Sequence, residues 1–171
     1  MNNQQVFFVM FGLSIMVYSF FARWYVVPWL AKVPQSVALT ALLWPHAIRH
    51  LGLGTLAPAL VDPAFPHDVG QQIAYGDLLA MLLAFAAIAA LRAEASFAFG
   101  LVWVAVVVGS LDLLNALGRA LFLEPRNFDQ IGSFWWVPTM WVPVLLVTSY
   151  LIFSNLIRGA RVAPSPVAGR P

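Results

Sequence analysis

The amino-acid sequence predicts an all-α integral membrane bundle of five transmembrane helices. Of its 171 residues, 61% are hydrophobic and only 9% are charged, against roughly 25% charged residues in a soluble domain. Uncharged apolar stretches of the length that crosses a bilayer, roughly 20 residues, recur along the chain. This composition excludes a soluble enzyme, a disordered protein and a nucleic-acid-binding protein. The sequence has no cysteine, which excludes disulfides and thiolate chemistry.

The five predicted spans follow one another with short connections rich in Pro, Asp and Gly. They cover residues 6–27, 34–56, 72–91, 97–121 and 134–157. In the second span, Pro45 lacks a backbone donor and predicts a kink at that point. Gly52, Gly54 and Pro58 predict a weakly formed end of the same helix.

The distribution of Lys and Arg predicts the orientation. The first residues, Met1-Asn-Asn-Gln-Gln, lack the basic region of a signal peptide, so the first span is expected to be retained. With five spans, one side of the membrane collects Arg23, Lys32, Arg92, Arg158, Arg161 and Arg170. The other side has Arg119 and Arg126, and Arg49 lies inside a span. The positive-inside rule therefore places the N-terminus outside and the C-terminus in the cytoplasm.

Two further features complete the predicted organisation. Residues 1–158 form one transmembrane domain, and residues 159–171 lack periodicity and are expected to be a disordered basic cytoplasmic tail. Trp135, Trp136 and Trp141 are expected to lie in an aromatic belt at the outer interface.

Ionisable side chains inside the predicted spans point to a polar pocket. At 1.5 Å per helical residue, His50, Asp77 and Asp112 lie at one depth, roughly 21–22 Å from the inner face. Residues spaced three, four or seven apart share a helix face, which groups polar side chains on the second and fourth spans. We therefore expect a ligand-binding pocket in the outer half of the bundle, formed by His46, Arg49, His50, Tyr75, Asp77, Asp112, Asn115 and Arg119.

The residue types leave three interpretations of this pocket. Histidines that titrate near neutrality and the fixed charge of Arg49 favour binding or passage of a small ligand, a lipid headgroup or an ion. Alternatively, Arg49 pairs with Asp77 and Asp112 pairs with Arg119, which locks the helices in an accessory or structural subunit of a larger membrane complex or homo-oligomer.

The third interpretation is a membrane metalloenzyme. His46 and His50, four residues apart, could bind a divalent metal together with Asp77 or Asp112. The signal is weak because the glutamate of the H-E-x-x-H motif is absent and Arg49 repels a cation. Apart from this divalent metal, no residue pattern implies a cofactor, and the sequence has no G-x-S-x-G motif or other catalytic motif, so an enzyme is not favoured.

Three segments carry a resemblance to known sequences: His46-Ala-Ile-Arg-His-Leu-Gly-Leu53, Ala74-Tyr-Gly-Asp77 and Asp112-Leu-Leu-Asn-Ala116. Together they resemble an uncharacterised family of small bacterial multi-pass inner-membrane proteins. The resemblance covers the second to fifth spans. It implies a protein of the bacterial inner (cytoplasmic) membrane, surrounded by the lipid bilayer, and it implies no activity and no functional residues.

Overall fold

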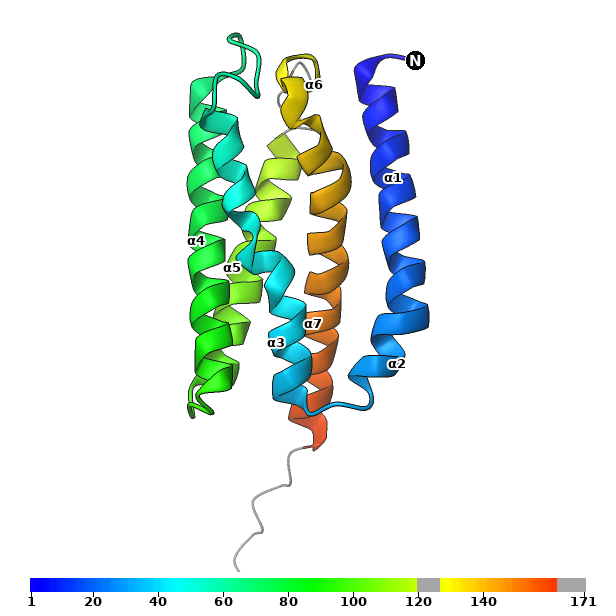
Figure 1. The fold of residues 1–171 in the computed structure, drawn as a ribbon, viewed down its shortest axis with the longest axis vertical. Helices are drawn as coiled ribbons and strands as arrows, with labels where there is room; N and C mark the ends of the chain where they lie inside the picture. The colour runs from blue at the N-terminus through cyan, green and yellow to red at the C-terminus, as the bar shows by residue number, and fades with distance from the viewer. Residues whose placement is uncertain (120–126, 163–171) are drawn as a thin grey trace, which may run out of the picture.

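The structure is a computed structural model that describes residues 1–119 and 127–162, and within these residues it is helical with no strand. The helical segments α1–α2, α3–η2, α4, α5 and α6–α7 run up and down beside one another (Figure 1). In chain order the elements are α1 (Asn3–Phe21), η1 (Ala22–Val26), α2 (Val27–Leu30), α3 (Gln35–Ala47), η2 (Arg49–Leu56), α4 (His67–Arg92), α5 (Ala98–Gly118), α6 (Asn127–Gln130), η4 (Gly132–Trp135), η5 (Val137–Trp141) and α7 (Val142–Val162).

Four of the helical segments are long and apolar enough to cross a membrane: Asn3–Leu30, His67–Arg92, Ala98–Gly118 and Gly132–Gly159. Their outward faces are apolar, as shown by the exposed side chains of Leu13 and Phe20 in α1, Leu82 in α4 and Leu111 in α5. Exposing such an apolar surface to water is unfavourable, whereas contact with lipid hydrocarbon is favourable.

The second predicted span differs most from expectation, because it is not one helix. The α-helix passes through Pro45 and ends at Ala47, and the chain continues as the 3₁₀-helix η2. The backbone N–H of Ile48 bonds to the Pro45 carbonyl at 3.2 Å, and that of Leu51 bonds to the Ile48 carbonyl at 3.3 Å. Since a 3₁₀-helix rises about 2.0 Å per residue, η2 extends about 16 Å beyond α3.

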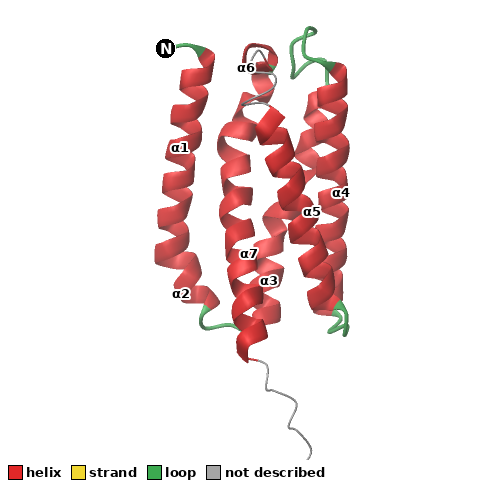
Figure 2. Ribbon diagram, turned by 180° about the vertical axis from the view of Figure 1, so that it is seen from behind, coloured by secondary structure: helices red, strands yellow, loops and turns green. Residues whose placement is uncertain are grey.

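The helices pack unequally. α4 contacts α3, η2 and α5, and its buried small residues Ala80, Ala84 and Ala87 permit close approach. By contrast, α1 lies at the edge of the bundle, beside α7 (Figure 2). α7 continues to Val162, so residues 159–162 of the predicted tail are helical, and residues 163–171 lie outside the described residues.

The end of the bundle that carries the N-terminus is closed by two segments that bond to each other. The Asp62 N–H donates to the Gln130 carbonyl at 2.9 Å, and the Phe134 N–H donates to the Leu60 carbonyl at 3.1 Å. Between them, Gly132 has a φ of +57°, and a Cβ at this position would lie 2.6 Å from the Leu60 carbonyl oxygen. Both the backbone conformation and the available space therefore require glycine here.

Replacing Gly132 with alanine is expected to lower the free energy of unfolding by about 1–3 kcal/mol, because the left-handed conformation and the contact with Leu60 both become unfavourable. Thermal unfolding in detergent measures the loss. Gly100→Ala is the matched control, since a Cβ at that position meets no atom within 4 Å. Equal stability of the two variants would contradict this account of the closed end.

Candidate functional site

Arg49 lies inside the bundle at the start of η2, with 1% of its side chain exposed. Its Nε donates to Asp77 Oδ1 at 2.6 Å, and its Nη1 donates to the Gly109 carbonyl at 2.8 Å. Its Nη2 lies 2.5 Å from Asp77 Oδ1 and also donates to Asp112 Oδ2. η2, α4 and α5 thus each contribute one charged side chain to what we call the Arg49 cluster: Arg49, Asp77 and Asp112.

Three glycines leave room for the Arg49 cluster. A Cβ on Gly52 would lie 2.7 Å from both Cβ and Cγ of Asp77, and a Cβ on Gly76 would lie 2.7 Å from Cγ of Asp112. A Cβ on Gly109 would lie 3.1 Å from Nη1 of Arg49. The sequence analysis did not identify Gly76 and Gly109 as site residues. Their positions could have indicated this role, because Gly76 directly precedes Asp77 and Gly109 lies one helical turn before Asp112.

The Arg49 cluster carries an excess of negative charge. One guanidinium faces two carboxylates, which gives a formal charge of −1 when all three groups are ionised. Each of the three Arg49 nitrogens already has an oxygen acceptor. Arg49 is therefore held by groups of the protein itself, and the two carboxylates outnumber the one guanidinium.

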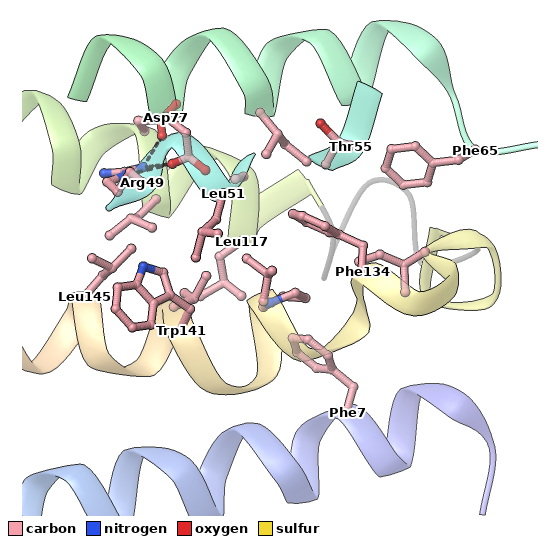
Figure 3. A pocket seen from close by; sticks show the side chains of 18 residues that line it. Phe7, Arg49, Leu51, Thr55, Phe65, Asp77, Leu117, Phe134, Trp141 and Leu145 are labelled. Atoms are coloured by element: carbon pink, nitrogen blue, oxygen red, sulfur yellow. Dashed lines mark hydrogen bonds and ion pairs between the residues drawn. The ribbon is translucent and has the colours of Figure 1, made fainter. Parts of the chain in front are cut away.

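A cavity of about 100 Å³ extends from the Arg49 cluster towards the closed end of the bundle. Figure 3 shows Arg49 and Asp77 at one end of the cavity and Phe65 and Phe134 towards the other. Most of its wall is apolar, and it is lined by all three members of the Arg49 cluster together with Phe7, Leu51, Thr55, Phe65, Ile73, Leu113, Ala116, Leu117, Ile131, Phe134, Val137, Pro138, Trp141, Val142 and Leu145.

Trp141, which also lines this cavity, has one polar side-chain atom, the indole Nε1. Its Nε1 is buried and has no hydrogen-bond partner among residues 1–119 and 127–162. Trp141 therefore lines the cavity beside the Arg49 cluster, instead of lying in the outer aromatic belt that the sequence predicted. A buried donor without an acceptor is energetically unfavourable.

A smaller cavity, of about 50 Å³, also reaches Asp112. It is lined by Gln72, Asn115 and Arg119 and shares Asp112, Phe65 and Ile131 with the larger cavity. Asp112 thus lies between the two cavities, and the smaller one extends along α5 towards the closed end of the bundle.

The two histidines of the predicted pocket do not join the Arg49 cluster. His46 is buried, but its Nε2 lies 3.1 Å from Thr148 Oγ1 on α7. His50 is exposed, so the prediction that it faces Asp77 and Asp112 is wrong, and Arg49 contacts both aspartates instead. The cause is the change of helical period, since η2 buries every third residue: Arg49, Gly52 and Thr55.

Of the three remaining residues of the predicted pocket, one lies outside both cavities and two line the smaller cavity. Tyr75 is 59% exposed and lies outside both cavities, whereas Asn115 is exposed but lines the smaller one. Arg119 donates to Gln72 Oε1, and its Nη2 lies 3.9 Å from Asp68 Oδ2. The predicted pair of Asp112 with Arg119 is therefore wrong, because Asp112 pairs with Arg49.

The geometry does not support the predicted metal site at His46 and His50. One ring bonds to Thr148 and the other is exposed, so the two do not converge with a carboxylate. Within residues 1–119 and 127–162, no three His, Asp or Glu side chains are grouped as metal ligands.

The fold and the site together define a class of protein: a helical bundle with four helices that are long and apolar enough to cross a membrane, containing a buried Arg–Asp–Asp cluster. Residues 6–157 match the family described as a domain of unknown function, DUF8737, and the chain belongs to this family. Neither the curated proteins nor the solved structures give a match to the chain.

Proposed function

We propose that this DUF8737 protein is a multi-pass protein of the bacterial inner membrane that binds or passes a small ligand at the cavity beside the Arg49 cluster. The charges at the two ends of the bundle support an orientation with the N-terminus outside. Among the described residues, Lys32, Arg92 and Arg158 lie near the C-terminal ends of α2, α4 and α7. These helix ends lie opposite the N-terminus (Figure 1), where the positive-inside rule expects the cytoplasm.

The observation that carries the proposal is the opening of the Arg49 cluster onto a cavity. Ionisable groups within a membrane cost about 2.5–3.5 kcal/mol each on insertion scales, so their position calls for a role. A cluster that served only to hold helices together would be enclosed by side chains. Here the side chains of Asp77 and Asp112 remain 15% and 18% exposed and line the cavity.

Native mass spectrometry tests this proposal on protein extracted from its own membrane in a mild detergent. We expect a bound species of constant mass on the wild-type protein. Ala116→Phe should remove that species, because Ala116 lines both cavities and the larger ring fills them. The matched control is Leu114→Phe, which lies on the same helix and is 57% exposed. A wild-type protein with no adduct, or an adduct that survives Ala116→Phe, would contradict binding in this cavity.

A second candidate function is the structural lock, in an accessory subunit of a larger membrane complex. It is favoured by the bonding of all three Arg49 nitrogens to groups on α4 and α5. Under this alternative, the Arg49 cluster stabilises the bundle and the cavity is incidental.

Asp112→Asn separates the two functions. An asparagine oxygen can still accept from Arg49, and the formal charge of the Arg49 cluster falls from −1 to zero. If the site is a ligand pocket, we therefore expect the free energy of unfolding to change by only about 1 kcal/mol, while the bound species in native mass spectrometry is lost. Asp68→Asn, at a carboxylate that is 79% exposed, is the control. A loss of several kcal/mol with the adduct retained would favour the lock.

A further inference from the structure

We propose that the ligand of this cavity is a small organic cation, with an ammonium group at the Arg49 cluster and an apolar body between the aromatic walls. This inference rests on the proposed function and specifies the chemical class of the ligand. Three independent features of the site lead to it: the charge, the walls and the acidic side chains at the end of the bundle near the smaller cavity.

The charge of the Arg49 cluster selects a cation. Each carboxylate uses one oxygen to accept from Arg49, namely Asp77 Oδ1 and Asp112 Oδ2. The second oxygen of each receives no hydrogen bond from any residue in the described part of the chain. One positive charge in the ligand would neutralise the formal charge of −1. An anion would instead raise the excess negative charge of the site.

The walls select an organic ion over an inorganic one. Phe7, Phe134 and Trp141 line the cavity, and aromatic faces attract cations through their quadrupoles. A Ca²⁺ or Mg²⁺ ion would require six or more oxygen ligands, and this largely apolar wall does not supply them. A volume of about 100 Å³ corresponds to roughly seven to ten water positions. The space therefore suits a small molecule and not a lipid tail.

The end of the bundle near the smaller cavity also suits a cation. The smaller cavity extends from Asp112 towards the closed end, where Asp62 precedes α4, Asp68 lies in the first turn of α4 and Asp129 lies in α6. Arg119, which lines the smaller cavity, donates to Gln72 and lies near Asp68. Carboxylates gathered at one end raise the local concentration of cations.

The test uses two probes of matched shape and size on the full chain in lipid nanodiscs. Phenyltrimethylammonium carries a fixed positive charge, and tert-butylbenzene is its neutral isostere. We expect the cation to raise the thermal unfolding temperature in a saturable manner and to bind at least about tenfold more tightly than the neutral probe. Asp112→Asn should abolish this preference, whereas Glu94→Gln, at an exposed carboxylate between α4 and α5 that lines neither cavity, should retain it.

The outcomes separate this inference from the proposed function. Equal binding of the two probes, or tighter binding of the neutral one, would overturn the cation proposal while leaving a ligand-binding cavity in place. Binding of neither probe, together with no adduct in native mass spectrometry, would overturn both. Since the comparison of probes needs only the wild-type protein, the test does not depend on the folding of any variant.

Discussion

Replacing Arg49 with methionine is expected to lower the free energy of unfolding by about 3–5 kcal/mol, because it leaves two buried carboxylates without their cation. The formal charge of the Arg49 cluster then changes from −1 to −2 on facing helices. Methionine is chosen since its unbranched apolar side chain occupies much of the space of the arginine stem. Unfolding in mixed micelles, followed by tryptophan fluorescence, measures the loss.

Two variants identify the cause of that loss. Arg23→Met removes an exposed arginine in η1 and is expected to change stability by less than about 1 kcal/mol. The triple variant Arg49→Met/Asp77→Asn/Asp112→Asn carries no charge in the Arg49 cluster and is expected to recover about 2 kcal/mol or more of the single variant's loss. A triple variant as unstable as Arg49→Met would show that the loss comes from packing of the arginine stem and not from unpaired charge.

The positions of the long helices could be predicted from the sequence because hydrocarbon leaves the backbone few alternatives. A stretch of roughly 20 apolar residues in lipid must satisfy its own hydrogen bonds, which an α-helix does. Hydropathy therefore placed spans at residues 72–91 and 97–121, and the structure has helices at His67–Arg92 and Ala98–Gly118.

Part of the candidate site could also be predicted, because an α-helix has a constant rise per residue. A constant rise of 1.5 Å per residue placed Asp77 and Asp112 at one depth, and Arg49 contacts both. The choice of partner could not be predicted, since depth does not tell which side chains on neighbouring helices face each other. The pairing of Asp112 with Arg49 instead of Arg119 depends on the rotation of α5, which long-range packing determines.

His50 shows why the period of a helix must be known before its faces are assigned. An α-helical period puts His46, Arg49 and His50 on one face, whereas three residues per turn put Arg49, Gly52 and Thr55 on one face and leave His50 outside. Pro45, Gly52 and Gly54 signalled a weak helix. They did not signal which alternative conformation would replace it.

Gly52→Ala is expected to lower the free energy of unfolding by about 3 kcal/mol. The added Cβ would lie 2.7 Å from Cβ of Asp77, an atom fixed by the backbone of α4, so a change of rotamer cannot relieve the contact. η2 must therefore move away from α4, and the hydrogen bond of 2.6 Å between Arg49 Nε and Asp77 Oδ1 lengthens with it. Both chemical unfolding and the binding of the cationic probe should report this change.

Alanine substitutions at other glycines provide the comparison for Gly52→Ala. A Cβ on Gly76 would overlap the Asp112 carboxylate, which Arg49 holds in place, so Gly76→Ala should also destabilise the bundle. Gly12 and Gly100 lie in helices where a Cβ meets nothing within 4 Å, and alanine there should be neutral or stabilising by up to about 1 kcal/mol. If Gly52→Ala matched Gly12→Ala in stability, η2 could not be held against α4 as closely as the Arg49 cluster requires.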